Sequence, residues 1–271
     1  MSGGRNILGN SDEICRKLLD AGERFDLILT DPPYNVGKNF GNREDRKKPE
    51  EYYRLMSERM ELYRGLLTDN GSVVSFSGKP FLCYVQMAMY NAGLFYRHLS
   101  VWQYDNGTSR SVNEPKQAFD PFLWYSKDDS NFVYNVDAVR VPYKSTERVK
   151  NPVYKKRADG SIYAWTPNPL GAMRNDVWAF PTLAGKLYKD ERTDHPTQKP
   201  ESLITELIKA HCPMKDGKFC GRILDPFHGS GTVGVCCEKL NRLGHDIEWV
   251  GIELEKRWVD AANARLDALL Q

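Results

Sequence analysis

Two strand-ending motifs at opposite ends of the 271-residue chain constrain its fold most strongly. Near the N-terminus, the apolar run at 25–30 ends in DPPY at 31–34, whose prolines cannot continue a helix or a central strand. Near the C-terminus, the strand-like run at 222–225 leads into a glycine-rich turn and the start of a helix. Such a turn presents backbone N–H groups to a ligand at the carboxyl end of its strand.

The order of these motifs indicates a circular permutation. Gly229, Gly231 and Gly234 satisfy G-x-G-x-x-G, and Glu253 follows 19 residues after Gly234, which taken alone fits a nicotinamide-dependent dehydrogenase. However, only 42 residues follow Gly229, whereas a dinucleotide-binding fold in the usual order needs roughly 100 more after its first turn. The rest of the sheet must therefore come from upstream sequence.

Helical and strand-like segments alternate along most of the chain, which predicts an open, mainly parallel α/β sheet with helices on both faces. We expect helices at 11–22, 49–71, 80–91, 201–211, 232–243 and 257–270, and strands at 25–31, 71–78, 94–104, 121–127, 221–227 and 247–254. The Gly- and Asn-rich stretch at 35–49 predicts a surface loop. The alternation is lost at 131–193, which predicts an inserted, substrate-facing module between a catalytic half at 1–130 and a cofactor-binding half at 194–271.

Composition favours a cytoplasmic protein that buries a full core. Hydrophobic residues make up 41% and aromatic residues 11% of the chain, and we find neither a membrane-spanning apolar run nor a signal peptide. The six cysteines form no C-x-x-C pair, so we interpret them as reduced packing residues. A metal site at His211, Cys212 and Cys220 would match no zinc spacing, and we predict none.

One segment carries most of the charge asymmetry, although the formal net charge is only +2. Residues 138–160 contain seven basic and two acidic residues, interleaved with Tyr143 and Tyr154. This mixture favours phosphate contact and base stacking, while a solvated loop remains the alternative. The candidate contacts are Arg140, Lys144, Arg148, Lys150, Lys155, Lys156 and Arg157.

Taken together and in this order, the motifs resemble the amino-methyltransferases of DNA in their β arrangement, where the catalytic motif precedes the target-recognition region and the cofactor motif comes last. The resemblance covers FDLILTDPPYN, GSVVSFSG, NDVW, HPTQKP, DPFHGSGT and GIELE. It implies a Rossmann-like, S-adenosylmethionine-dependent methyltransferase sheet of the seven-stranded type. The implied substrate is a base flipped out of double-stranded DNA.

The DPPY motif suits transfer to an exocyclic amine, and the candidate catalytic residues are Asp31, Pro32, Pro33 and Tyr34. The Asp31 carboxylate and the Pro32 carbonyl would each accept one amine N–H, which directs the nitrogen lone pair at the methyl group. Tyr34 offers a ring on which the flipped base can stack. In the family, DPPY usually accompanies adenine N6, whereas a serine in place of Asp31 usually accompanies cytosine N4.

The expected cofactor residues come from both ends of the chain: Asn10, Asp31, His195, Thr197, Lys199, Asp225, Pro226, Phe227, Gly229, Ser230, Gly231, Thr232 and Glu253. The two glycines would permit close backbone approach, Phe227 would pack on the adenine side, Thr232 would cap the following helix, and Glu253 would hold the ribose. By resemblance, Thr197 and Lys199 line the methionine end. Asn10 offers an amide where relatives commonly carry Asp.

Several alternatives stay open at this stage. The target could be cytosine N4 or RNA, and a catalytically silent DNA-binding subunit would keep the same fold. A homodimer and a cognate restriction endonuclease are open as partners. The dehydrogenase is the most distant alternative.

Overall fold

An eight-stranded sheet organises the part of the chain that the computed structural model describes, which is residues 3–38, 45–107, 109, 111–145, 147–151 and 153–270. The strands, in spatial order, are β1 (Arg5–Leu8), β12 (Glu248–Glu253), β11 (Arg222–Asp225), β2 (Phe25–Thr30), β3 (Leu67–Phe76), β5 (Phe119–Ser126), β4 (Phe95–Gln103) and β8 (Val177–Ala179). The first five strands in this order, β1, β12, β11, β2 and β3, are parallel to one another. Strand β5 is antiparallel to both of its neighbours, and β8 is parallel to β4.

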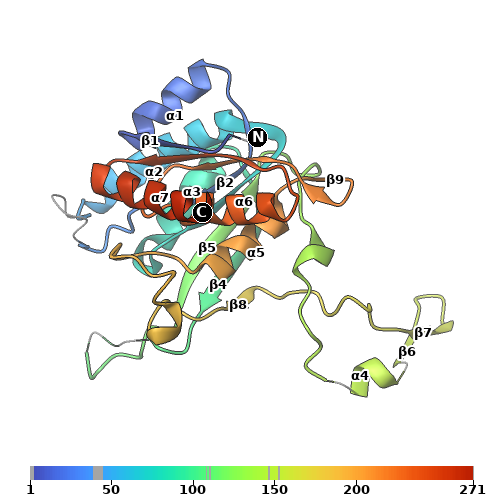
Figure 1. Cartoon of the computed structure of the whole chain (residues 1–271). Helices are drawn as coiled ribbons and strands as arrows, with labels where there is room; N and C mark the ends of the chain where they lie inside the picture. Colours follow the sequence, from blue (N-terminus) through green and yellow to red (C-terminus); the bar gives the residue numbers. More distant parts are fainter. Residues whose placement is uncertain are drawn as a thin grey trace.

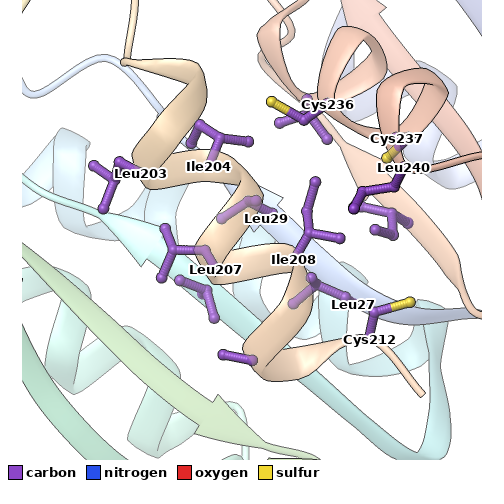
Figure 2. Packing of buried hydrophobic residues seen from close by; sticks show 14 of the residues in the cluster. Leu27, Leu29, Leu203, Ile204, Leu207, Ile208, Cys212, Cys236, Cys237 and Leu240 are labelled. Carbon is purple, nitrogen blue, oxygen red and sulfur yellow. The ribbon is translucent and has the colours of Figure 1, made fainter. Parts of the chain in front are cut away.

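Helices cover both faces of this sheet (Figure 1), which confirms the predicted α/β architecture. One layer holds α1 (Ser11–Asp20), α2 (Pro49–Leu66) and α3 (Leu82–Asn91), and the other holds α5 (Glu201–His211), α6 (Thr232–Arg242) and α7 (Lys256–Leu270). Alternate residues of β2 face opposite layers: Ile28 packs with α1 to α3, whereas Leu27 and Leu29 pack with α5 and α6 (Figure 2).

Strand pairing joins the two ends of the chain, as the predicted permutation requires. The N-terminal β1 lies parallel to the C-terminal β12, and the Gly9 amide donates to the Glu253 carbonyl at 2.8 Å. The chain leaves β11 towards β12 on one side and leaves β2 towards β3 on the other. The crevice between β11 and β2 is therefore the topological switch point of the parallel half, where ligands bind in open α/β sheets.

Three features of the main sheet and its helices differ most clearly from the predictions. The second helix does not continue to the Asn70-Gly71 pair but ends at Leu66, because Leu67 is fully buried and pairs with Phe25 at the start of β3. Strand β1 was not predicted, because its four residues are partly exposed and show no alternation. Strand β8 belongs to the main sheet although it lies inside the predicted insertion at 131–193.

The remaining insertion reaches away from the sheet and carries α4 (Glu147–Lys150), β6 (Val153–Lys156) and β7 (Ile162–Trp165) at its far end (Figure 1). The two strands form an antiparallel hairpin in which Lys155 pairs with Tyr163. Residues 39–44 of the predicted surface loop lie outside the described residues, as does the side chain of Arg148.

Packing accounts for only some of the cysteines. Cys15, Cys212, Cys236 and Cys237 are buried, and burial raises the pKa of the Cys15, Cys212 and Cys236 thiols to about 12. Cys83 and Cys220 are exposed, so the packing interpretation was wrong for them. No helix in the described part of the chain has the length and apolar character needed to cross a membrane.

Candidate active site

Asp31 stands directly after β2, where both of its carboxylate oxygens have partners. The Tyr34 hydroxyl donates to Oδ1 at 2.5 Å, and the Lys199 ammonium donates to Oδ2. Burial and the Asp31 charge hold the pKa of Tyr34 well above its usual value, so the phenol stays protonated as a donor. Residues 168 positions apart in the sequence thus form one hydrogen-bonded triad.

Lys199 has an environment that keeps its ammonium on Asp31. The side chain is only 7% exposed, and Nζ lies 5.4 Å from the ring centre of Tyr34, 5.0 Å from that of Phe76 and 6.0 Å from that of Trp102. Aromatic faces attract a cation, so they complement the carboxylate. The sequence predicts Lys199 at the methionine end of the cofactor, and in the structure its ammonium lies on the Asp31 carboxylate.

Two cavities meet at Asp31. The Glu253 cavity, about 290 Å³, opens at the carboxyl ends of β1, β2, β11 and β12. The Tyr34 cavity, about 620 Å³, lies on the other side of the DPPY motif. Asp31, Pro33, Asp45 and Thr197 line both. A group bound in one cavity can therefore meet a group bound in the other at the Asp31 carboxylate.

The Glu253 cavity gathers many of the predicted cofactor residues: Asn10, Asp31, His195, Thr197, Pro226, Phe227, Gly229 and Glu253. Asp225, Ser230 and Thr232 instead line a neighbouring cavity of about 40 Å³, which also reaches Asp31 and Lys199. Residues that the sequence analysis missed complete the larger cavity, among them Asp12, Lys47, Tyr52, Arg59 and Trp258. They lie in helices or loops, and no motif marks them.

Glu253 anchors the glycine-rich turn in the Glu253 cavity. Its carboxylate accepts a hydrogen bond from the Gly229 amide at 2.9 Å and another from the Glu255 amide at 2.8 Å. Burial raises the pKa of this carboxyl. His195 packs edge-on against Trp258 in the same cavity, and burial lowers its pKa to about 4, so the imidazole is neutral at neutral pH.

The two glycines of the turn serve packing in ways that the sequence did not reveal. A Cβ on Gly229 would lie 2.9 Å from His195 Nε2, and one on Gly231 would lie 2.6 Å from the Ala262 Cβ of α7. Both residues also have positive φ angles, of 52° and 83°. Because Gly229 has no side chain, the His195 ring can pack against it, and the absence of a side chain at Gly231 lets α7 pack against the turn.

Three other cofactor predictions need adjustment. Thr232 does not cap α6: Gly231 occupies the N-cap, and the Thr232 hydroxyl is contacted by Arg265 at 3.3 Å. Asp225 is buried and holds the His228 ring at 3.0 Å. Asn10 is the N-cap of α1, so its side-chain oxygen accepts from Asp12 and Glu13, and a ligand would meet its amide.

The Glu253 cavity has groups that suit S-adenosylmethionine. A carboxylate at Glu253 suits ribose hydroxyls, the rings of Phe227 and Trp258 suit a purine, and Asp31 supplies negative charge at the opening to the Tyr34 cavity. Arg59 stacks on Phe227 at 4.9 Å and binds Asp12 through two hydrogen bonds, of 2.7 and 3.1 Å. These contacts fix the wall of the cavity.

Comparison with known proteins decides the family. The model of the DNA methylase family of N6 and N4 methyltransferases matches residues 25–264, which include the DPPY motif, the glycine-rich turn and Glu253. The chain belongs to this DNA methylase family. It is an S-adenosylmethionine-dependent DNA methyltransferase.

Individual relatives match the methyltransferase over nearly its whole length. Type II methyltransferase M.HpaI from Haemophilus parainfluenzae is 31% identical over 97% of this chain and 74% of its own. DNA adenine methyltransferase YhdJ from Escherichia coli K12 is 28% identical over 90% of this chain and 77% of its own. The crystal structure of the M1.HpyAVI–SAM complex has the same fold, with a TM-score of 0.66 and 22% identity, over 98% of this chain and 100% of that one.

We expect Glu253→Ala to weaken S-adenosylmethionine binding to the methyltransferase by roughly ten- to a hundredfold, because hydrogen bonds to a charged group contribute about 1.5–3 kcal/mol. Glu253→Gln keeps an oxygen for the Gly229 amide and should lose less. Calorimetric titration with the cofactor measures both affinities, and thermal melting checks the fold. A folded Glu253→Ala protein with wild-type affinity would remove Glu253 from the cofactor site.

The predicted DNA-contact residues divide into two groups. Arg140 is only 12% exposed and binds Asp137 at 2.6 Å and the Gly171 carbonyl at 2.9 Å, so the fold itself uses it, and we no longer place it in the contact set. On the hairpin, Lys155 lies 4.6 Å over Trp165 and Arg157 lies 4.8 Å over Tyr163. Lys144 and Lys156 are exposed, and Lys150 pairs loosely with Glu147 at 3.7 Å.

Proposed function

We propose that this methyltransferase transfers the methyl group of S-adenosylmethionine to N6 of an adenine that is flipped out of double-stranded DNA. The observation that carries the proposal is the position of Asp31, which lines both the Glu253 cavity and the Tyr34 cavity. A flipped base in the Tyr34 cavity would then present its amine to the Asp31 carboxylate. When bound, S-adenosylmethionine supplies an electrophilic methyl group.

The protein residues orient the amine, and the Asp31 carboxylate can accept the proton that the nitrogen loses as it bonds to the methyl carbon. An exocyclic amine is a poor nucleophile because its lone pair is delocalised into the ring, and two acceptors can draw it towards tetrahedral geometry. The two acceptors are a carboxylate oxygen of Asp31 and the carbonyl oxygen of Pro32. Each would accept one N–H of the amine where the two cavities meet. Lys199 and Tyr34 hold the Asp31 carboxylate in place.

Two features support adenine as the target base. Aspartate at position 31 usually accompanies adenine N6 in the family, and the relative YhdJ is described as a DNA adenine methyltransferase. The family itself includes both N6 and N4 enzymes. Transfer to cytosine N4 is therefore the competing outcome in the experiment below.

The experiment incubates the purified protein with methyl-labelled S-adenosylmethionine and a duplex library of random sequence, digests the DNA and identifies the labelled nucleoside. We expect label in N6-methyldeoxyadenosine, with none from Asp31→Ala and little when single-stranded DNA or RNA replaces the duplex. Label in N4-methyldeoxycytidine would overturn the adenine assignment. Absence of transfer by folded protein that binds the cofactor would favour a silent subunit.

Tyr34 should contribute through both its ring and its hydroxyl. Base–aromatic stacking contributes about 1–3 kcal/mol, so Tyr34→Ala should lower single-turnover methylation by tenfold to a hundredfold or more. The sequence assigned Tyr34 only an aromatic role, but its hydroxyl contacts Asp31 at 2.5 Å, so Tyr34→Phe should lose about tenfold. Wild-type activity in Tyr34→Phe would mean that the hydroxyl is unimportant. Equal losses of activity in Tyr34→Phe and Tyr34→Ala would refute the stacking role of the ring.

The hairpin should contact DNA phosphates. Lys155 and Arg157 lie two residues apart and therefore share a face, so Lys155→Glu/Arg157→Glu should weaken binding to all sequences and reduce the salt slope by about two. The matched control is Arg16→Glu/Lys17→Glu on α1, which makes the same charge change at exposed positions outside the hairpin. Fluorescence anisotropy at several salt concentrations gives both slopes. Identical salt slopes in the two variants would mean that the hairpin is a solvated loop without DNA contacts.

A further inference from the structure

Arg265 of α7 connects two parts of the active site that come from different segments of the chain. One terminal nitrogen of its guanidinium donates to the Ser230 carbonyl at 2.7 Å, inside the glycine-rich turn. The other terminal nitrogen donates to the carboxylate of Glu201, the first residue of α5, at 2.8 Å. Arg265 itself lines neither the Glu253 cavity nor the Tyr34 cavity. Any influence on the reaction must therefore pass through the groups that it holds.

On the turn, Arg265 fixes Ser230 through both its backbone and its side chain. The nitrogen that binds the Ser230 carbonyl also lies 3.4 Å from the Ser230 hydroxyl and 3.3 Å from that of Thr232. The Gly231 amide, which belongs to the same planar peptide unit as the Ser230 carbonyl, donates to the His228 carbonyl at 2.9 Å. Both ends of this peptide unit are therefore held.

The turn leaves one backbone donor for a ligand. The amides of Phe227, His228, Gly229 and Gly231 donate within the protein, to Asp225, Ile252, Glu253 and His228 respectively. Within residues 227–231, all of which the structure describes, the Ser230 amide has no such partner. Ser230 lines the cavity of about 40 Å³ that also reaches Asp31 and Lys199. A cofactor group that binds this amide would therefore depend on how Arg265 holds Ser230.

The second partner of Arg265, Glu201, follows directly on the segment that carries Lys199. The side chains of both Arg265 and Glu201 are largely buried, with 15% and 13% of their surface exposed. The Glu201 amide donates to the Glu191 carboxylate at 2.7 Å, so the start of α5 is held by its backbone as well. Two residues earlier, the Lys199 ammonium donates to Asp31. Arg265 thus joins the glycine-rich turn to the segment that contacts the catalytic carboxylate.

We propose that Arg265, held by Glu201, is a positioning residue that keeps the cofactor turn and the Lys199 segment in a fixed relation, so that a bound cofactor lies correctly for transfer at Asp31. The planar guanidinium presents separate N–H groups to Ser230 and Glu201, a geometry that a lysine ammonium does not reproduce. A displacement of about 1 Å between reacting groups can cost about a hundredfold in rate. The part of this inference that concerns Asp31 rests on the proposed function.

The test compares Arg265→Met and Arg265→Lys with the wild type. Methionine keeps an apolar stem and removes the donors, so the affinity for S-adenosylmethionine, measured by calorimetry without DNA, should fall about tenfold. The single-turnover rate at saturating cofactor and DNA should also fall about tenfold. Lysine can serve only one of the two acceptors at a time and should recover part of both losses. Thermal melting checks that each variant is folded.

The matched control is Arg174→Met. Arg174 is also largely buried and also joins a backbone carbonyl, that of Val139, to a carboxylate of α5, that of Glu206. It contacts no residue of the glycine-rich turn in these bonds, so its loss should leave the affinity for S-adenosylmethionine near wild type. An equal loss of affinity in Arg174→Met and Arg265→Met would overturn the proposal, because any buried arginine on α5 would then have the same effect.

A double variant tests whether Arg265 acts through the Lys199 segment. Residues in one network have non-additive effects, so Arg265→Met/Lys199→Met should lose less in single-turnover rate than the product of the two single losses. Multiplicative losses would contradict the link to Lys199, and wild-type cofactor affinity in Arg265→Met would remove Arg265 from the positioning of the turn. Because the affinity is measured without DNA, label in cytosine would refute the adenine assignment and leave this result unaffected.

Discussion

Replacing Asp31 by alanine should lower the single-turnover rate of methyl transfer about a thousandfold or more, while the affinity for S-adenosylmethionine changes less than about fivefold. We expect the rate to depend on Asp31 because its carboxylate is a charged acceptor that lines both cavities. Losing one preorganised electrostatic contact at a reacting atom typically costs about 10²–10³ in rate, and Asp31 also orders Lys199 and Tyr34. Rapid-quench methylation with saturating cofactor and DNA measures the rate.

The alanine variant needs a companion because it leaves the buried Lys199 ammonium without its carboxylate. Removing one partner of a buried pair can destabilise a protein by about 3–5 kcal/mol. Asp31→Asn keeps the size of the side chain and one acceptor oxygen, for either the Tyr34 hydroxyl or the Lys199 ammonium, and it removes the charge. It should fold, bind the cofactor and still lose at least about a hundredfold in rate. A fast Asn variant would show that the negative charge of Asp31 has no part in the chemical step.

Replacing Lys199 by methionine should lower kcat about a hundredfold with little change in the KM for either substrate. Methionine retains an apolar stem among Tyr34, Phe76 and Trp102, so the main loss is the charge-assisted hydrogen bond to Asp31. Lys199→Arg keeps the charge and should recover part of the rate. Steady-state kinetics of the folded variants measures the split between kcat and KM.

The matched control for this variant is Lys239→Met. Lys239 also donates to a carboxylate, that of Glu201, but its side chain is 49% exposed and Glu201 keeps Arg265 as a second partner. Its activity should therefore stay near wild type, because exposed ion pairs contribute little. If Lys199→Met were as active as Lys239→Met, the buried Lys199 ammonium would have no influence on the function of Asp31.

The strongest sequence predictions were those in which a local pattern dictates a local structure. The proline pair after the apolar run at 25–30 must end a buried strand, and the glycine-rich turn must join a strand to a helix, so the position of both motifs followed from the chain alone. The permutation was predicted from the order of the two motifs, with DPPY at 31–34 before the glycine-rich turn at 229–234. The pairing of β1 with β12 confirms it.

Contacts between distant segments could not be predicted in the same way. Nothing near Lys199 in the sequence indicates that its ammonium binds Asp31, because the contact depends on how the segment before α5 crosses the end of β2. The role of Gly231 depends on α7, whose Ala262 occupies the space that a side chain would need.

The most direct test of the central claim is a crystal structure of the protein with a methyl-free cofactor product and a duplex that contains its identified target site. The account predicts an adenine outside the helical stack, with its exocyclic nitrogen hydrogen-bonded to Asp31 and its ring packed against Tyr34, while the cofactor product occupies the Glu253 cavity. A target base that stays stacked in the duplex, or whose amine is bound by residues other than Asp31, would contradict it.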